Sequence, residues 1–301
     1  MSTAEWRAGA RPVAALLLLL GAGGACAQAS PGPADAPDPL VAQELARVSA
    51  ARTLRWSATL LVSQGNALSL HKVTPDGVTA VDGDGQALAT AAGELTLRID
   101  GLPALAQPRR PALALDTDQA AIARLQRGYR IEVLPLDRVD GRPALPLKLT
   151  PLDRWRYGST LWIDRDTGLV SKTELRQPDG QRLAQTMLTA LVFESGAVAL
   201  PAVADGAAVT PQWLVQGMPE GFGMTQVIRD GAAEQILVSD GLAAVSVFIE
   251  PLAAGVAGQN GTSQRGLLAS VAQVRGDFQL VVIGVVPPHT VERLLNGVTR
   301  R

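Results

Sequence analysis

Cysteine, histidine, aromatic residues and net charge are all scarce in this chain, and most of these shortages exclude something. Cys26 is the only cysteine among 301 residues, so a disulfide within one chain is excluded. Aromatic residues make up 4% of the chain, so a core must rest on Leu, Val, Ala and Ile. The formal net charge is −1, which leaves no basic field to hold a phosphate backbone. We therefore do not expect direct binding to nucleic acid.

The length and the hydrophobic content indicate ordinary globular domains. The 301 residues are enough for about two domains of ~100–200 residues each. Hydrophobic residues make up 47% and charged residues 18%, which is typical of folded rather than disordered chains. The sequence contains no internal repeat and no run of like charges. We therefore predict a folded protein of two domains.

The first 27 residues have the pattern of a cleaved signal peptide. Arg7 and Arg11 give a positive start, and the apolar run Val13–Leu20 follows them. Ala25–Ala27 then offers small residues at the −3 and −1 positions of a cleavage site. The apolar run is shorter than the ~20 residues of a membrane-spanning helix. We predict that residues 1–27 direct export and are removed.

Two other interpretations of this leader stay open. The leader could remain as an uncleaved anchor, although its apolar run is short for that purpose. Alternatively, Cys26 could be the acylated first residue of a lipoprotein. That pattern requires an aliphatic residue three positions earlier, where Gly23 stands. Cleavage after Ala27 would instead leave a mature chain with no cysteine.

The segment after the leader predicts a spacer and then a short helix. Residues 28–37 are rich in Pro, Ala and Gly, which is typical of a flexible spacer. Asp38 is a candidate N-cap. Val41, Leu45 and Val48 then recur at helical spacing and predict an amphipathic helix. A second helix is expected from Thr117 to about Arg127 by the same signals.

β-strand patterns fill most of the remaining chain before residue 196. The clearest expected strands are Ser159–Asp164, Leu169–Gln177 and Gln181–Val192, joined by Asp-Thr-Gly and Pro-Asp-Gly turns. In the middle strand, one face carries Lys172, Glu174 and Arg176, and the other carries Leu169, Thr173 and Leu175. One wet face and one dry face predict an antiparallel sheet that covers a core on one side.

A second domain is expected after a break in composition. Residues 196–211 are mostly Ala, Gly, Val and Pro with a single charge, Asp205, which indicates a linker that we place at 196–208. Six strand-like runs with Asp-Gly and Gly-Asp turns follow within residues 209–301. A closing amphipathic helix is expected from the apolar spacing of Val291, Leu294, Leu295 and Val298.

Motifs for catalysis, cofactors and metals are not found. The only histidines are His71 and His289, and Glu292 stands one helical turn after the second. A zinc site needs three or four ligands, so this pair predicts a surface contact instead. The chain contains no nucleophile elbow, phosphate loop or dinucleotide fingerprint. We therefore predict no catalytic residue, cofactor or metal, although a hydrolase that uses His71 or His289 stays open as a third hypothesis.

Apolar and aromatic side chains offer the remaining candidates for binding. An open sheet with a dry face can bind an acyl chain, since each buried CH₂ contributes ~0.8 kcal/mol. The candidates to line a lipid pocket are Trp56, Trp155, Tyr157 and Trp162, with ordinary core or rim packing as the alternative. Phe248 shares a strand face with Ser246, opposite Val247, so it marks either a contact surface or a second packed layer.

Three segments carry a resemblance to a known family. Residues 151–169, PLDRWRYGSTLWIDRDTGL, are similar to the aromatic "DRYRYG" run and "LWLD..TGL" strand of the MucB/RseB family. Residues 237–251, LVSDGLAAVSVFIEP, resemble its "YSDGLASVSVFIEP" hairpin, and residues 281–291, VVIGVVPPHTV, resemble its "VVGEVP..TV" ending. The matches keep the family's order over roughly residues 125–300. Residues 50–110 depart from its aromatic, Arg-rich strands.

The resemblance implies a mainly β (α+β) fold. Residues 38–195 would form a half-open antiparallel β-barrel with helices, like the lipoprotein carriers LolA and LolB. Residues 209–301 would form a smaller antiparallel sheet with a C-terminal helix. The boundary near residue 205 that composition indicates agrees with this division.

The resemblance also implies a function without catalysis. Such proteins work in the periplasm as negative regulators of a sigma-E-type envelope stress response. They bind the periplasmic part of a membrane-spanning anti-sigma factor, shield it from proteolysis, and release it on a lipoprotein or lipopolysaccharide signal. The hairpin near residue 240 gives the partner-binding candidates Asp240, Gly241, Ser246, Phe248 and Glu250. A lipid carrier of the LolA/LolB type is the alternative, and a homo-oligomer is left open.

Overall fold

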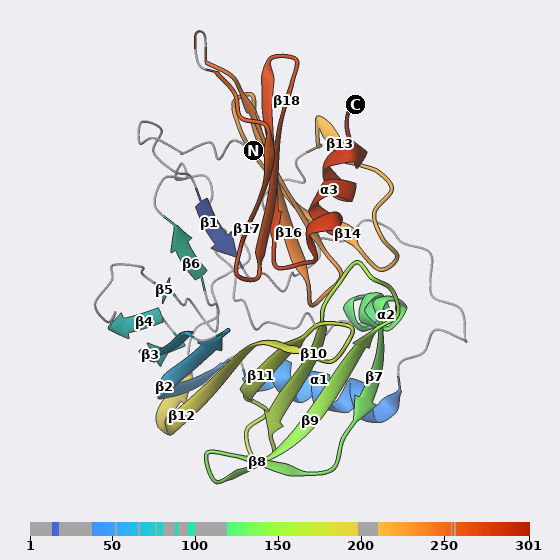
Figure 1. The fold of residues 1–301 in the computed structure, drawn as a ribbon. Coiled ribbons are helices and arrows are strands. Elements are labelled where there is room, and N and C mark those ends of the chain that lie inside the picture. Colours follow the sequence, from blue (N-terminus) through green and yellow to red (C-terminus); the bar gives the residue numbers. More distant parts are fainter. Residues whose placement is uncertain are drawn as a thin grey trace.

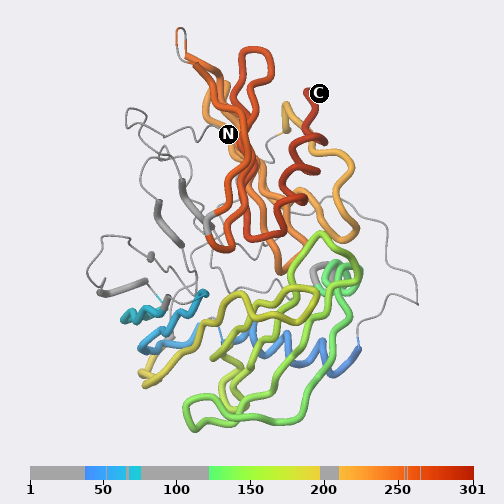
Figure 2. The backbone as a smooth tube through the Cα atoms, viewed as in Figure 1, coloured from blue at the N-terminus to red at the C-terminus, as the bar shows by residue number. Residues whose placement is uncertain are grey.

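The computed structural model contains two sheet domains (Figure 1), and a tube through the same backbone follows the chain from end to end (Figure 2). The described residues are 14–17, 38–51, 53–65, 67–75, 77–80, 88–89, 96–99, 119–197, 210–253, 255 and 257–301. The predicted spacer lies outside them, as do most of the predicted leader and most of the linker at 196–208. The domain boundaries therefore stay predictions.

The N-terminal domain contains an open antiparallel sheet of nine strands within the described residues. Their order is β4-β3-β2-β12-β11-β10-β9-β7, and β8 pairs with β9 off this path. The bounds are β2 Leu54–Gln64, β3 Ala67–Thr74, β4 Gly77–Ala80, β7 Tyr129–Val133, β8 Asp137–Val139, β9 Arg142–Pro151, β10 Gly158–Asp164, β11 Val170–Arg176 and β12 Arg182–Ala197. Because β4 and β7 are separate edges, the sheet does not close on itself.

Two helices cover one face of this sheet. Helix α1 (Pro39–Ala51) begins after Asp38, whose Oδ1 accepts a 2.8 Å hydrogen bond from the Leu40 N–H. The predicted stripe of Val41, Leu45 and Val48 is buried against the sheet. Helix α2 (Gln119–Gly128) adds buried side chains to the same core and lies at the edge nearest the C-terminal domain (Figure 1). This helix-covered face is the dry side of the sheet.

The C-terminal domain is a second antiparallel sheet with one helix. Its strand order is β14-β15-β16-β19-β18-β17. The bounds are β14 Gly223–Asp230, β15 Ala233–Ser239, β16 Ala244–Pro251, β17 Gly261–Arg265, β18 Leu268–Arg275 and β19 Phe278–Gly284. Helix α3 (Pro288–Gly297) begins after Pro287 and packs Val291, Leu294 and Leu295 into the sheet core. The predicted closing helix is therefore confirmed.

Two smaller sheets complete the described structure. β13 (Trp213–Val215) pairs with β20 (Val298–Arg300), which joins the start of the C-terminal domain to its last strand. β1 (Ala14–Leu17), β6 (Thr96–Ile99) and β5 (Leu88–Ala89) form a three-stranded sheet. β1 belongs to the predicted leader, so cleavage at the predicted site would remove it. None of the helices in the described ranges has the length and apolar content needed to cross a membrane.

The expected fold class is confirmed, but one face of the N-terminal sheet differs from expectation. Glu174, expected on the wet face of β11, is 5% exposed, while Leu175 is half-buried. The Glu174 carboxylate lies 2.8 Å from Lys172 Nζ and also pairs with Arg176. Against the opposing effect of burial, these two cations lower the pKa of Glu174. Paired charges therefore replace water on this part of the face.

Candidate functional site

A buried arginine joins the two domains where the β9–β10 loop meets the β15–β16 turn. Arg156 and Asp240 are both 0% exposed, and Arg156 Nη1 donates a 2.6 Å hydrogen bond to Asp240 Oδ2. The same guanidinium donates to both carboxylate oxygens of Asp153, at 3.1 and 2.8 Å. It also donates to the backbone carbonyl of Glu220. One side chain of the N-terminal domain thus has two partners in the C-terminal domain.

Asp240 is held by its own turn as well as by the arginine. Its Oδ1 accepts the N–H groups of Leu242 at 2.9 Å and Ala243 at 2.7 Å. Burial opposes the charged form of the Asp240 carboxyl, whereas Arg156 and these two N–H groups favour it. Burial, together with the nearby Asp240 charge, also raises the pKa of Tyr129 well above its ordinary value. The two N–H groups of the turn therefore fix the orientation of the Asp240 carboxylate toward Arg156.

Two aromatic rings and a glycine surround the Arg156 guanidinium. The Arg156 guanidinium lies 4.7 Å from the Phe222 ring centre and 5.3 Å from that of Tyr129. A Cβ atom at Gly128 would lie 1.9 Å from Arg156 Nη1, so only glycine leaves room there. Leu242, from the C-terminal turn, packs against the core of the N-terminal domain. The junction therefore combines a buried ion pair with apolar contact.

A second cluster lies beside the junction, around Trp155. The ring of His289, on α3, meets the Trp155 ring edge-on at 5.1 Å. His289 Nε2 donates to the Arg154 carbonyl at 2.7 Å, and Thr290 Oγ1 donates to the Trp155 carbonyl at 2.8 Å. The guanidinium groups of Arg154 and Arg293 lie 4.7 and 4.6 Å from the same tryptophan ring. The first turn of α3 therefore holds the β9–β10 loop.

The structure does not bring the four lipid-pocket candidates together. Trp56 is buried on the helix-covered face of the sheet, next to Leu60 and Leu188. Trp162 lies on the opposite face, where its Nε1–H donates to Asp137 at 2.9 Å. Trp155 and Tyr157 are in the β9–β10 loop, and burial raises the pKa of Tyr157. Their role in lipid binding stays a prediction, and Trp56 belongs to a buried cluster that is separate from the core under α1 and α2.

The partner-binding candidates are largely buried. Asp240 faces Arg156, and Gly241 takes a positive φ of 98° in the same turn. Phe248 and Ser246 are each 6% exposed, which agrees with the second packed layer and not with an exposed contact surface. Glu250 is half-buried near the end of β16. Their role in binding a partner stays a prediction.

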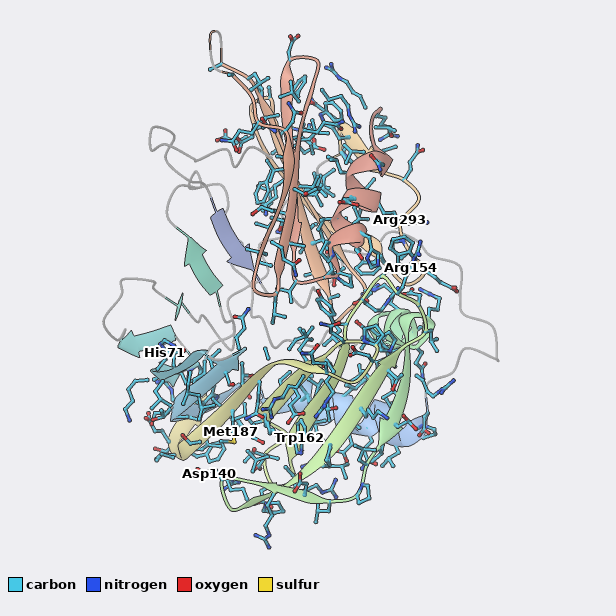
Figure 3. The ribbon with its side chains drawn as sticks, viewed as in Figure 1. His71, Asp140, Arg154, Trp162, Met187 and Arg293 are labelled. Atoms are coloured by element: carbon cyan, nitrogen blue, oxygen red, sulfur yellow. The ribbon has the colours of Figure 1, made fainter. Side chains whose placement is uncertain are left out.

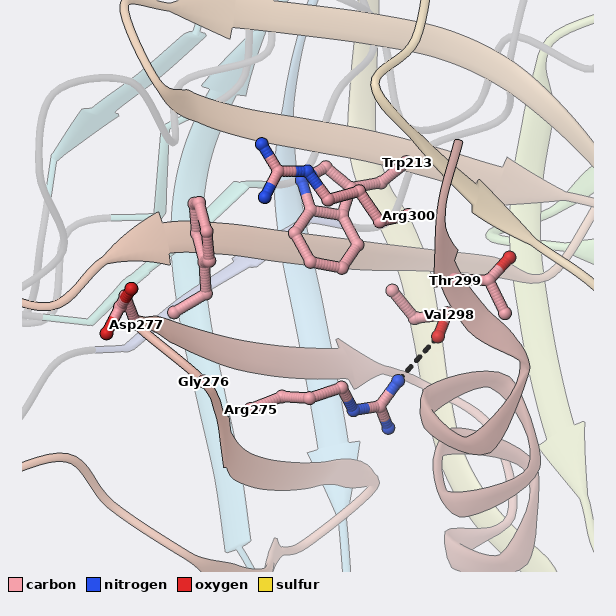
Figure 4. Close-up of a pocket in the computed structure, with 8 residues that line it drawn as sticks. Trp213, Arg275, Gly276, Asp277, Val298, Thr299 and Arg300 are labelled. Carbon is pink, nitrogen blue, oxygen red and sulfur yellow. Dashed lines mark hydrogen bonds between the residues drawn. The ribbon is translucent and has the colours of Figure 1, made fainter.

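One pocket lies in the C-terminal domain, between the β18–β19 turn and β20 (Figure 4). It has a volume of about 540 Å³, and its aromatic walls are Trp213 and Phe278, whose rings meet edge-on at 5.3 Å. The Arg300 guanidinium lies within 6 Å of both ring centres, at 5.9 and 5.6 Å. Arg275 donates to the Val298 carbonyl at its rim. This pocket could not be predicted from the sequence, because its walls come from segments far apart in the chain.

The histidines do not assemble a metal or triad site within the described residues. His71 Nε2 is hydrogen-bonded to Ser69 Oγ at 2.9 Å, two positions away on β3, while its Nδ1 has no partner in the described structure. A triad needs a carboxylate at that atom to orient the ring. No group of three His, Cys, Asp or Glu side chains in the described ranges is close enough to hold a metal ion.

Comparison with known proteins connects these two domains to one family. The family model for the MucB/RseB N-terminal domain matches residues 43–216, and that for the MucB/RseB C-terminal domain matches residues 207–299. This chain belongs to the MucB/RseB family. Two of the three segments that resemble the family, residues 151–169 and 237–251, meet at the Arg156–Asp240 junction.

Individual members of the family are similar to more than half of this chain. The sigma factor AlgU regulatory protein MucB of Pseudomonas aeruginosa is 36% identical over 195 residues, which cover 57% of this chain and 61% of that protein. The sigma-E factor regulatory protein RseB of Haemophilus influenzae is 23% identical over 229 residues, which cover 67% of this chain and 72% of that one. The chain therefore aligns with less than two thirds of that MucB.

Solved MucB structures share the fold. The MucB chain in the Pseudomonas aeruginosa MucA/MucB complex superposes with a TM-score of 0.62 at 29% identity, covering 86% of this chain and 98% of that chain. A structure of MucB alone gives a TM-score of 0.58 at 29% identity, covering 90% and 100%. Both comparisons span the two domains together.

Proposed function

We propose that this protein is an exported, non-enzymatic negative regulator of a sigma-E-type envelope stress response. It binds the periplasmic part of a membrane-spanning anti-sigma factor and protects that segment from proteolysis. The observation that carries the proposal is the superposition, over both domains, on a MucB that was solved in complex with MucA. The proposed location is the periplasm, reached through the signal peptide at residues 1–27.

The arrangement of side chains supports binding rather than catalysis. The most deeply buried polar cluster, around Arg156, is paired by Asp240 and Asp153. Such a cluster positions two domains and leaves no base or nucleophile facing a cleft. The Ser69–His71 contact has no orienting carboxylate among the described residues. A function through surfaces is therefore the better fit to the described chain.

Release by a lipid or lipoprotein signal is the second part of the proposal. The helix-covered face of β2 and β12 is lined by Trp56, Leu60 and Leu188, which suits an acyl chain. A ligand that favours the free regulator must weaken the complex by the same coupling free energy, typically ~1–3 kcal/mol. Acyl ligand and anti-sigma factor are then expected to oppose each other.

Calorimetric titration of the whole chain with the periplasmic part of the cognate anti-sigma factor tests the first part. We expect a dissociation constant of about 1 μM or tighter. A shortened acyl lipopeptide, added first, is expected to weaken binding by about tenfold. No heat of binding with partner at about 10 μM would refute the regulator. Lipopeptide binding without partner binding would favour the LolA/LolB-type carrier instead.

A further inference from the structure

Two arginines from different domains share one tryptophan ring. Arg154 and Trp155 belong to the β9–β10 loop of the N-terminal domain, and Arg293 belongs to α3 of the C-terminal domain. Both guanidinium groups lie within 5 Å of the Trp155 ring centre, at 4.7 and 4.6 Å. Figure 3 shows the two labelled arginines one above the other where the domains meet. We call these three residues the arginine–tryptophan surface.

The surface is held in place by contacts that reach beyond it. Arg293 Nε donates to the Gly217 carbonyl at 2.8 Å, which fixes the direction of its side chain. His289 and Thr290 hold the backbone carbonyls of Arg154 and Trp155, at 2.7 and 2.8 Å. The groups that a ligand would meet are thus ordered before it arrives, which lowers the entropy lost on binding.

The two arginines of this surface differ from the ion-paired arginines elsewhere in the described structure. Arg142, Arg156 and Arg229 each pair with a carboxylate that is almost fully buried. Arg154 and Arg293 are exposed, and neither has an ion pair with any residue that the structure describes. Because both cations lie on one ring, an anionic ligand that binds beside Trp155 gains from both.

We propose that the arginine–tryptophan surface binds an acidic, extended segment of the anti-sigma factor, an inference that rests on the proposed function. Guanidinium groups bind carboxylates through two parallel hydrogen bonds. Acidic residues two positions apart in an extended segment lie on one face about 7 Å apart, so a short segment can present two carboxylates to the two arginines. Arginine and tryptophan are also the side chains that contribute most to protein–protein binding.

A polypeptide fits this surface better than an anionic lipid does. An acyl tail needs an apolar groove beside its headgroup. The side chains next to Trp155 are instead His289, Thr290 and the two arginines. Leu152, exposed in the same loop, offers a single apolar contact of the kind that one peptide side chain covers.

The surface exists only while the domains are docked. Its two arginines come from separate domains, and the neighbouring Arg156 forms the buried pair with Asp240 that joins them. Separation of the domains would divide the surface between them. The acidic segment therefore binds the docked arrangement, and a signal that separates the domains releases it.

The test is calorimetric binding of the whole chain to the periplasmic part of the cognate anti-sigma factor. Arg154→Glu/Arg293→Glu is compared with Arg138→Glu, an exposed arginine on β8 far from the junction. The double charge reversal is expected to weaken binding at least tenfold, and the control is expected to change it by less than twofold. The wild-type dissociation constant should rise with salt more steeply than that of the double variant.

Further variants and a lipid probe separate the remaining outcomes. Arg154→Lys/Arg293→Lys keeps the charge but loses the paired hydrogen bonds, so we expect it to lie between the wild type and the charge reversal. Circular dichroism and thermal unfolding verify that each variant is folded, and acid-to-amide changes in the partner probe the same contact from its side. If the wild type binds and the reversal binds within twofold of it, the surface is refuted while the regulator stands. If the charge reversal loses binding to phosphatidylglycerol vesicles but keeps binding to the anti-sigma factor, the proposed acidic-peptide site is likewise refuted. If the wild type does not bind the anti-sigma factor, the proposed regulatory function itself is refuted.

Discussion

Replacing Asp240 by Asn removes the negative charge of the buried interdomain pair and keeps the shape of the side chain. The remaining amide oxygen can still accept the N–H groups of Leu242 and Ala243, so the turn is expected to persist. The lost partner is Arg156, which is 0% exposed and retains Asp153 as its carboxylate. Breaking one side of a buried pair costs about 3–5 kcal/mol. Because Asp153 remains, we expect about 3 kcal/mol, at the lower end.

This free energy acts on the docking of the domains before it acts on either core. Each domain has its own hydrophobic cluster, so undocking exposes the junction without unfolding a sheet. A loss of about 3 kcal/mol shifts the docking equilibrium about 100-fold. Small-angle X-ray scattering of Asp240→Asn should show a larger radius of gyration than that of the wild type. In calorimetry we expect one unfolding transition for the wild type and two for Asp240→Asn.

Two variants make this result interpretable. Asp277→Asn changes an exposed carboxylate in the β18–β19 turn of the same domain and should leave scattering and unfolding unchanged. Arg156→Met/Asp240→Leu replaces the pair by apolar side chains and should recover much of the stability, since neither charge is then left unpaired. The reasoning is refuted if Asp240→Asn has the scattering of the wild type and loses less than about 0.5 kcal/mol, the level of an ordinary surface change.

Three further perturbations follow from the same contacts. Gly128→Ala should destabilise the protein by about 1–3 kcal/mol in urea unfolding, because its Cβ would lie 1.9 Å from Arg156 Nη1. Gly223→Ala is the control, because a Cβ there would have no atom within 4 Å. Equal losses of stability in the two variants would contradict the prediction. Burial disfavours the charged form of Asp164, but the hydrogen bonds from Arg142 and Thr167 outweigh this effect and lower the pKa of Asp164. The stabilisation that charged Asp164 contributes is then complete above about pH 4 and is lost as the pH falls further. Asp164→Asn should therefore reduce the dependence of the free energy of unfolding on pH at acid pH. Trp162→Phe removes the largest cause of the lowered pKa of Asp137 and should raise that pKa in a carboxyl NMR titration, whereas no change would refute the Trp162–Asp137 hydrogen bond as its cause.

Local patterns predicted the elements of this fold well, since their signals are close together in the chain. The spacing of Val41, Leu45 and Val48 predicts the buried stripe of α1, and that of Val291, Leu294 and Leu295 predicts the buried face of α3. The burial of Glu174 could not be predicted from alternation, because it depends on two cations of the same strand pairing with it.

The junction lay beyond any local pattern. Arg156 and Asp240 are 84 positions apart, and neither belongs to a motif with a known chemical role. The sequence signal at these positions is the family resemblance, because two of its three matching segments contain these two residues. Those segments were interpreted as lipid-binding and partner-binding candidates, while in the structure each contacts the other. The resemblance covers both segments, but it does not single out Arg156 or indicate that Arg156 contacts Asp240.

Protection of the anti-sigma factor from its protease tests the central claim most directly. The purified periplasmic part of the cognate anti-sigma factor is incubated with the protease that starts its degradation, with and without this chain. We predict that a small molar excess of the chain slows cleavage at least tenfold, and that an acyl lipopeptide restores it. An equal cleavage rate in the presence and absence of the folded chain would contradict the account.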